Sequence, residues 1–544
     1  MKQIRTILNG PLGAGLKLSC AERLKKVDYK YMTEPFRLRN EDDGAWRCEF
    51  WGKVVRSAIL TNFHLQDAEL DKIIRQTVQD IMKTQTPDGC ISSYPADKQL
   101  TCWDIWGRKY VLLALLRYYD MVEKSEDVKK CCTAMVDHLM TQIGPDRENI
   151  TACGYHGGLA SSSILGAIIG VYRISGEKRF LDFAEYIINT GCSDKHNIFD
   201  EVKAGTFPCN LGNGKAYEMT SCFQGLAEFH LLHPHEEYRK ICEMYFDLIC
   251  ERELFVTGAA GGRDKFGEFW FDGTFKQTAN IDCGLGETCV TVTFLHYCAR
   301  MAQITRNAAI SDKMERSLYN SILGMMAPDG SHWAHVNPTP LTGGGFKQPA
   351  GDQIELNFNK PFDGHDCCRA QGPEGLGLAA DLAVTQFADG IALNFFEPLT
   401  SEISDGTKIV VSGNYPLSPT AEIAIYARDK FTIYIRVAEF CKSIQLNGEP
   451  LDIQHGSYLK ISRIWQSSDK LVVNFDFTVK EITPPDNSPY TAYLRGPLLL
   501  ASESQGITAD PLLSLNHKGL NLVDYISAGK EMNSSNTLTV WHKK

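Results

Sequence analysis

The stretch "EGLGLAADLAVTQFADGIALNFFEP" (374–398) contains the point at which the sequence pattern changes from helical to extended. Residues 374–387 repeat apolar side chains with the spacing of an amphipathic helix. After "FADG" (387–390) the period becomes two and β-branched and aromatic side chains are common, which is typical of strands. The sequence therefore predicts a helical region that ends near residue 388 and a β region that follows it.

Helical periodicity covers most of the chain before this point. Apolar residues recur at i, i+3, i+4 and i+7 in the segments 68–85, 104–122, 126–143, 161–176, 178–191, 220–232, 236–253, 287–305, 311–327 and 374–387. Short turns with Gly, Pro or Asp join them in pairs, and no tight repeat of the tetratricopeptide kind is present. A closed ring of helical hairpins, an (α/α) barrel, fits this pattern, and an α-solenoid is the alternative.

Strand patterns dominate the rest of the chain. They occur at 391–398, 408–413, 421–427, 430–438, 470–479 and 491–501, separated by turn residues at a spacing typical of a sandwich. We therefore expect an α+β multidomain protein. Its helical catalytic domain would occupy residues 1–388 and its β-sandwich domain residues 389–544.

Composition excludes several classes of function. The formal net charge of −10 argues against a nucleic acid or an anionic membrane as partner, since either would favour a basic face. No stretch approaches the roughly 20 apolar residues that span a bilayer, and the first residues lack the apolar core of a signal peptide. The 18 cysteines have no regular spacing. We therefore expect mostly buried thiols and a cytoplasmic location.

Two long irregular stretches, 256–286 and 335–366, each lead into a helix start that contains cysteine. Loops of this length in a compact domain are usually functional or disordered. The first ends in "GETC", with Glu287 and Cys289, and the second ends at Cys367 and Cys368. One carboxylate and three sulfurs suit a four-coordinate zinc ion. The spacing is not that of a zinc finger, so cysteines that simply fill the core are the alternative.

A second cysteine pair, Cys131–Cys132, lies inside an ordinary amphipathic helix pattern, and we assign it no function. Cys367–Cys368 differs because it follows "GHD" and precedes "RAQGPEG", at the start of a helix. A thiolate there gains from the helix dipole and from Arg369. From the residues alone, both the functional and the structural explanation stay open.

Glu268 lies in "FGEFW", beside Phe269 and Trp270. A carboxyl group among aromatic side chains tends to have a raised pKa, which suits a general acid. A solvated loop glutamate is the alternative.

Taken together, these motifs resemble a known family. "GEFW…GLGETC", "MERSLYN" (314–320), "HVNP" (335–338), the cysteine pair and "YLRGPLLLA" (493–501) follow the order and nearly the spacing of glycoside hydrolase family 127. That family is typified by β-L-arabinofuranosidases. The resemblance implies an (α/α)6 barrel catalytic domain followed by β-sandwich domains.

The resemblance also implies a retaining exo-glycoside hydrolase with a Zn²⁺ cofactor, acting on an oligosaccharide or glycoside. Glu287, Cys289, Cys367 and Cys368 would hold the zinc, Cys367 would also be the nucleophile, and Glu268 the general acid/base. Glu315, in "MER", falls on a substrate-contacting glutamate of the family. Trp270, next but one to Glu268, is a further expected substrate contact.

The chain departs from the family around this centre. His365 stands at the first cysteine of the family's Cys-x-Cys-Cys-Pro-Pro-Asn run, and His335 at a tyrosine. Two sugar-binding histidines of the family fall near Met219 and Tyr110. The replacements that we expect to contact substrate are Asp104, Arg108, His156 and His335, and polar side chains with a purely structural role are the alternative for each. The added basic residues Arg369 and Arg108 favour a furanoside that carries a carboxylate.

Two other classes of protein remain open from the sequence. One is a non-catalytic carbohydrate-binding protein in which the zinc is structural, since four protein ligands close a site. The other is a sugar epimerase or lyase on a helical barrel. A thiol redox enzyme fits least, because the sequence has no C-x-x-C motif. The oligomeric state is open, a homodimer included.

Overall fold

A computed structural model describes residues 3–41, 46–262, 268–279, 285–341, 367–503, 508–530 and 537–544. His365 and most of the stretch 335–366 lie outside these residues. The helices are α1 (Pro11–Ser19), α2 (Tyr29–Leu38), α3 (Phe50–Leu65), α4 (Ala68–Met82), α5 (Asp104–Met121), α6 (Glu126–Gln142), α7 (Leu159–Ser162), α8 (Leu165–Ser175), α9 (Lys178–Asn189), α10 (Ile198–Lys203), α11 (Ala216–Leu232), α12 (Glu236–Arg252), α13 (Thr288–Thr305), α14 (Ala309–Arg316) and α15 (Cys367–Ala383).

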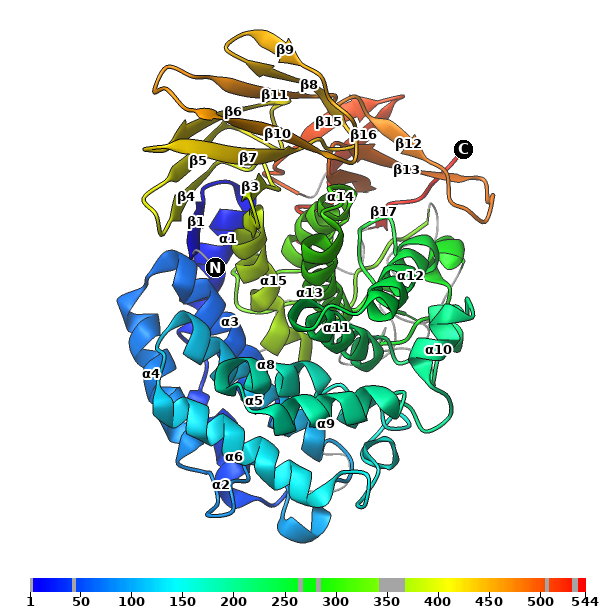
Figure 1. Ribbon diagram of the computed structural model, residues 1–544. Helices are drawn as coiled ribbons and strands as arrows, with labels where there is room; N and C mark the ends of the chain where they lie inside the picture. The colour runs from blue at the N-terminus through cyan, green and yellow to red at the C-terminus, as the bar shows by residue number, and fades with distance from the viewer. Residues whose placement is uncertain are drawn as a thin grey trace.

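Six of these helices form a closed inner ring. Each packs on the next in the order α3, α5, α8, α11, α13 and α15, and α15 returns to α3. A second layer lies outside, where α4, α6, α9, α12 and α14 pack on the inner helices that precede them in the chain. The predicted (α/α)6 barrel is confirmed, because a solenoid would not close on itself (Figure 1).

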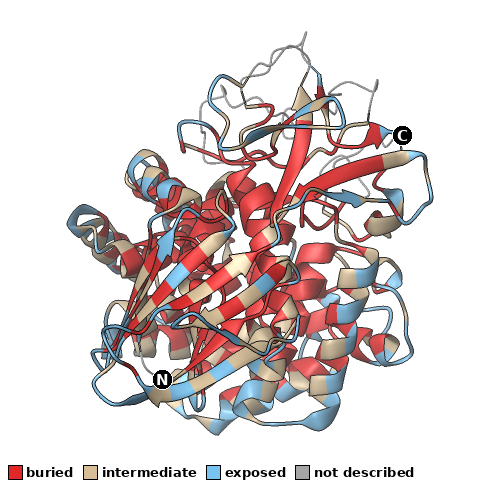
Figure 2. Cartoon of the chain, turned by 90° about the horizontal axis from the view of Figure 1, so that it is seen from above, coloured by how far each residue is buried: buried red, intermediate tan, exposed pale blue. Residues whose placement is uncertain are grey.

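Burial separates the two layers. The outer helix α4 buries one stripe, which consists of Leu70, Ile74, Thr77, Val78 and Ile81. The inner helix α5 buries 13 of its 18 residues, charged ones included. Figure 2 shows the same contrast, with buried residues concentrated in the central helices. Inner helices are therefore enclosed on all sides, and a polar side chain on one of them must find a partner inside the barrel.

The strands gather above one end of the barrel (Figure 1). They are β1 (Ile4–Leu8), β2 (Val384–Phe387), β3 (Gly390–Leu393), β4 (Leu399–Ile403), β5 (Lys408–Gly413), β6 (Thr420–Tyr426), β7 (Lys430–Arg436), β8 (Cys441–Leu446), β9 (Glu449–Leu451), β10 (Tyr458–Ile464), β11 (Leu471–Phe475), β12 (Lys480–Ile482), β13 (Tyr490–Arg495), β14 (Leu498–Glu503), β15 (Ser514–His517), β16 (Leu520–Asp524), β17 (Leu538–Thr539) and β18 (His542–Lys543).

Three sheets are described. One has the order β1-β4-β5-β6-β11-β8-β9, the second β10-β7-β3-β2, and the third β12-β13-β14-β16-β15 with β17 on β14 and β18 on β13. The β-rich part confirms the predicted class. The first strand of the chain joins the first sheet, with Ile4 opposite Ile403 and Leu8 opposite Leu399. Residues 4–8 thus tie the start of the chain to the β-rich part, and the boundary at 388 stays a prediction.

Two segments differ from the sequence prediction. Residues 384–387, predicted as the end of a helix, form strand β2, whereas the helix start that the sequence placed at Cys367 is where α15 begins. The segment 491–501, predicted as one strand, forms β13 and β14 with a turn at Gly496. A short apolar run fits helix and strand equally well, so neighbouring elements decide between them.

The cysteines behave largely as predicted. Every described cysteine is free, and most are buried. Within the described residues, no helix is long and apolar enough to cross a membrane.

Candidate active site

The start of α13 is fixed by two neighbouring segments of irregular chain. Glu287 precedes the helix, and its N–H donates to the Ala260 carbonyl at 2.8 Å. The Thr288 N–H donates to the His335 carbonyl at 2.9 Å. Gly286 has a φ of +68°, and a Cβ there would lie 2.5 Å from the Ala259 side chain, so this turn requires glycine. These contacts hold Glu287 beside His335.

The start of α15 meets the start of α13. Glu287, Cys289, Cys367 and Cys368 each offer one donor atom, and these four atoms lie within 4.8 Å of one another. Glu287 Oε1 is 3.4 Å from Cys368 Sγ and 3.7 Å from Cys367 Sγ. The two adjacent sulfurs are 3.9 Å apart and unbonded. The structure thus brings together the four residues that the sequence predicted as metal ligands.

The donor set fits zinc. Tetrahedral zinc with Zn–S bonds of about 2.3 Å separates its donor atoms by about 3.8 Å, close to the spacing found here. Glu287 is buried, and no hydrogen-bond partner for its Oε2 lies among the described residues. A buried carboxylate oxygen without a donor is costly unless a cation satisfies it. Three sulfurs and one carboxylate favour zinc over magnesium or calcium.

The three thiols of this cysteine cluster differ in pKa. Burial opposes ionisation of Cys289, but hydrogen bonds from Cys367 and Cys368 and the charge of Lys53 lower its pKa below the ordinary value. The hydrogen bond with Cys289 raises the pKa of Cys367, and burial raises that of Cys368. Burial, followed by the charge of Cys367, also raises the pKa of Glu287. The residues alone favour a single thiolate, and a divalent cation is the group that would hold all three thiols deprotonated.

Glu268 lies at the edge of this cluster. A carboxylate oxygen of Glu268 is within 4.8 Å of donor atoms of Glu287, His335 and Cys367. The prediction that its pKa is raised is wrong. Burial is the largest single effect and raises it, but the ion pair with Lys215 and the charges of His335 and His156 together outweigh burial, so the pKa is lowered. Its side chain is 24% exposed and therefore accessible to a ligand.

His156 lies on the same side as Glu268. Its ring packs edge-on against Phe269, with centroids 6.2 Å apart, and lies 5.4 Å from the Trp103 ring. Asn213 Nδ2 is 3.1 Å from its Nδ1. His335 is nearer the cluster, with Nε2 3.6 Å from Glu287 Oε1. Both predicted histidines are thus placed close to Glu268, and their contact with substrate stays a prediction.

The structure does not bring the other expected substrate contacts to the cluster. Asp104 and Arg108 form a buried ion pair with each other at 2.7 Å, and Arg108 also donates to Gln142 at 2.9 Å. Trp270 is fully buried and donates through Nε1 to the Tyr245 hydroxyl at 3.0 Å. These contacts account for the three side chains as parts of the barrel interior.

Glu315 and Arg369 have other surroundings. Glu315 on α14 is buried and pairs with Arg436 of β7 at 2.7 Å, which joins the barrel to the β-rich part. Arg369 follows the cysteine pair in α15, is partly buried, and its carbonyl accepts a hydrogen bond from Arg23 Nε at 3.2 Å. A substrate contact by either residue remains a prediction.

Sequence reasoning missed two lysines at the site. Lys215 pairs with Glu268, and its Nζ is 3.9 Å from Glu218 Oε1. Lys53 on α3 lies 4.0 Å from Cys289 Sγ and 3.1 Å from Glu49. Both are buried. Lys53 could have been found from the sequence, because it interrupts the apolar run "FWGKVV" and a lysine is seldom buried without a partner.

Comparisons with known proteins agree with this arrangement. The profile described as the β-L-arabinofuranosidase GH127 catalytic domain matches residues 20–378, and that of the GH127 middle domain matches residues 390–477. A relative named non-reducing end β-L-arabinofuranosidase, from Bifidobacterium longum subsp. longum, is 21% identical over 488 residues, which cover 80% of this chain and 72% of the relative.

Solved structures share the fold over the whole length. A GH127 β-L-arabinofuranosidase from Geobacillus stearothermophilus T6 superposes with a TM-score of 0.78 at 18% identity, covering 99% of this chain and 100% of that one. Another structure, of a GH127 β-arabinofuranosidase, gives a TM-score of 0.76 at 16% identity, covering 99% and 96%. Because the catalytic-domain profile spans well over half of the chain, the protein belongs to glycoside hydrolase family 127 and is a glycoside hydrolase, rather than the binding protein or epimerase that the sequence alone also allowed.

Proposed function

We propose that the chain is a retaining exo-glycosidase for L-arabinofuranosides, with Cys367 as nucleophile and Glu268 as general acid/base. One observation carries the proposal. Among the three clustered thiols, Cys289 and Cys368 are fully buried, whereas Cys367 is partly exposed and lies within 4.8 Å of Glu268. Only Cys367 is therefore open both to a sugar and to an acid/base group.

The spacing of the two groups supports retention of configuration. In glycosidases with two carboxyl groups, retaining enzymes place them about 5–5.5 Å apart and inverting enzymes about 6.5–9.5 Å apart. The wider gap leaves room for a water molecule that attacks directly. The distance of at most 4.8 Å between Cys367 and Glu268 leaves no such room, so direct attack by the side chain is favoured.

Glu287, Cys289, Cys367 and Cys368 would hold a zinc ion. When bound, the ion would keep the Cys367 thiol deprotonated at neutral pH. Lys53 adds a fixed positive charge 4.0 Å from Cys289 Sγ. This charge offsets part of the negative charge that three thiolates and a carboxylate bring together.

The side chains can then act in two steps. In the first, the Cys367 thiolate bonds to the anomeric carbon, the glycosidic C–O bond breaks, and Glu268 gives its proton to the leaving oxygen. In the second, Glu268 takes a proton from a water molecule, the water oxygen bonds to the anomeric carbon, and the C–S bond breaks. Cys367 leaves as the thiolate with which it began.

The sugar class is proposed from the relatives, and the surroundings of Arg108 and Arg369 bear on whether the sugar is acidic. The relatives named above are β-L-arabinofuranosidases, and we propose an L-arabinofuranoside or a related furanoside. Arg108 does not support an acidic sugar, because it is paired with Asp104. Arg369 is the remaining residue that supports an acidic sugar as substrate. Turnover of neutral and carboxylate-bearing furanosides separates the two, and equal or faster turnover of the neutral sugar rules out the acidic one.

Covalent labelling tests the nucleophile. A furanose-configured cyclophellitol-type epoxide should add one label per chain, and peptide mass spectrometry should find it on Cys367. Cys367→Ser should lose the label and reduce kcat by at least about 10³-fold. Cys131→Ser, in the other adjacent pair, should keep both. Labelling of wild type on any other residue would contradict the proposal.

A further inference from the structure

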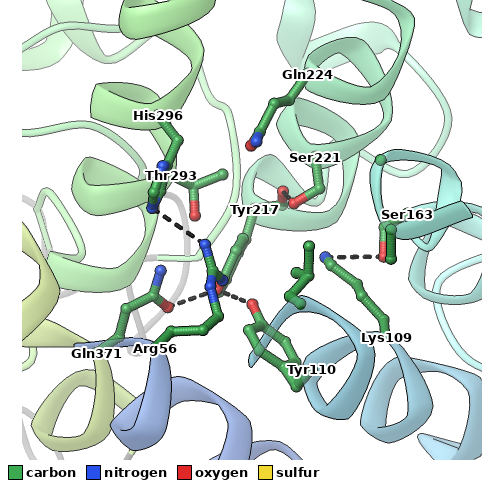
Figure 3. Close-up of a pocket in the computed structure, with 13 residues that line it drawn as sticks. Arg56, Lys109, Tyr110, Ser163, Tyr217, Ser221, Gln224, Thr293, His296 and Gln371 are labelled. Carbon is green, nitrogen blue, oxygen red and sulfur yellow. Dashed lines mark hydrogen bonds between the residues drawn. The ribbon is translucent and has the colours of Figure 1, made fainter. Parts of the chain in front are cut away.

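A small cavity lies inside the inner ring of helices, and none of the four cluster residues lines it. Its volume is about 20 Å³, which is room for about one water-sized group. Pockets for drug-sized ligands have roughly 300–1,000 Å³, so a sugar is excluded. Figure 3 shows the lining side chains converging from α3, α5, α11, α13 and α15.

The cavity wall carries positive charge. Arg56 and Lys109 line it, and among the described residues no aspartate or glutamate does, although Glu228 accepts a hydrogen bond from Gln224 of the wall at 3.0 Å. The Arg56 guanidinium is 3.0 Å from Glu374 Oε1. The same carboxylate also forms an ion pair with Arg117 and lies 3.0 Å from His296. Glu228 also acts on Arg56 but is paired with Arg300, so Arg56 shares both of its carboxylates with other arginines.

Lys109 has no ion-pair partner among the described residues. Its Nζ donates to Ser163 Oγ at 3.1 Å and lies 4.0 Å from the centroid of the Trp106 ring. Among the described residues, no carboxylate comes within 4.0 Å of it. Glu218 acts on it from further away, but Glu218 lies nearer to Lys215. Burial lowers the pKa of Lys109 to about 7, as expected for a buried ammonium without a counter-ion.

A third donor faces the same space. Gln371 accepts a hydrogen bond from the Tyr217 hydroxyl through Oε1, which leaves its amide nitrogen to donate. No acceptor for that nitrogen lies among the described residues. Figure 3 shows the Gln371 amide beside Arg56, across the cavity from Lys109. An acceptor bound in the cavity would receive a hydrogen bond from this nitrogen.

We propose that this cavity binds a small monovalent anion of the size of chloride, held by Arg56, Lys109 and the Gln371 amide. Size and charge both fit, because the space admits about one such group and Lys109 on its wall has no carboxylate partner among the described residues. Leu113, Gly166 and Gln224 at the wall are partly exposed, which gives the ion a route of exchange. The site would stabilise the barrel, and it does not depend on the proposed chemistry at Cys367.

The anion should stabilise the intact protein. At pH 6 and constant ionic strength, replacing sodium gluconate with sodium chloride should raise the unfolding temperature by about 2 °C, saturably with chloride. Lys109→Met should abolish the chloride-dependent shift. Lys530→Met is the matched control, because Lys530 is a largely buried lysine that donates to the Leu323 carbonyl, away from the cavity, and the shift should persist.

Bromide locates the site directly, even if Lys109→Met does not fold. Crystals of the wild-type protein soaked in sodium bromide should show an anomalous peak in the cavity, within about 3.5 Å of Lys109 Nζ and of Arg56. Absence of that peak, or an equal shift in chloride and gluconate, would overturn the proposal and leave a water molecule beside a neutral Lys109.

Discussion

The protein has two pairs of neighbouring cysteines, Cys131–Cys132 and Cys367–Cys368, whose structural surroundings differ. Cys131 and Cys132 lie in the middle of α6 and are buried. Burial alone raises the pKa of Cys131 to about 12. Cys367 and Cys368 begin α15, and Glu287, Cys289 and His335 lie against them.

The comparison teaches that adjacency is not the functional signal. A mid-helix pair can bury both thiols as small apolar groups, because its backbone is satisfied within the helix. A pair at a helix start lies beside backbone N–H groups that the helix leaves unpaired, and a second helix start can place polar side chains next to it. In this protein the second start is that of α13, which brings Glu287 and Cys289.

Removal of one thiol from each pair should give the largest contrast. Cys368→Ala should lose the metal and reduce kcat by about 10³-fold or more, because one of four ligands is gone. Cys132→Ala should retain activity and lose about 1 kcal/mol of unfolding free energy, since only a small buried group is removed. Metal content by mass spectrometry and denaturant unfolding measure both effects. Equal metal content in the two variants would remove the distinction between the pairs.

Substitution of Lys53 should show whether its positive charge contributes to metal binding by the cysteine cluster. Lys53→Met keeps the length of the side chain but removes the cation 4.0 Å from Cys289 Sγ. We expect zinc affinity to fall about tenfold, the lower end of losses for residues that contact metal ligands. Competition with a chromogenic chelator measures it. Lys25→Met, which removes a surface ion pair with Asp67, is the control and should leave affinity unchanged.

Lys215 should give the smallest change, a shift in pH dependence. Lys215 lowers the pKa of Glu268, so its removal should raise that pKa. Glu268 must be protonated to act as acid, and kcat/KM falls as pH rises through its pKa. In Lys215→Met this fall should therefore move to higher pH, by about one unit.

Lys215→Arg preserves the positive charge next to Glu268. Its pH profile of kcat/KM should follow that of the wild type. If Lys215→Met and wild type lose activity at the same pH, Glu268 is not the acid.

Much of the fold and the centre of the site could be predicted from the sequence. Periodicity located most helices of the barrel, and the change of period near residue 388 located the β-rich part. The strand at residues 4–8 was missed because its partner, β4, lies almost 400 residues away. Short strands gain their stability from such partners, so local sequence carries little sign of them.

The residues around the centre were predicted less well. Arg108 and Trp270 have the residue types that bind sugars, yet both are satisfied inside the barrel, by Asp104 and Tyr245. Lys215 and Lys53 were overlooked, although they contact Glu268 and Cys289. Residue type indicates what a side chain can bind, and only packing decides what it faces.

The sequence by itself determined the helical and extended periods, the family motifs and the four residues of the cysteine cluster. The periods depend on local spacing, and the motifs and the four residues on residue types in short segments, which the chain carries wherever it folds. The tertiary structure decided which thiol is open, which lysine pairs with Glu268, and that one cavity inside the ring has cations but, among the described residues, no carboxylate on its wall. Such properties depend on burial and on charges far apart in the chain, and they exist only once the ring of helices has closed.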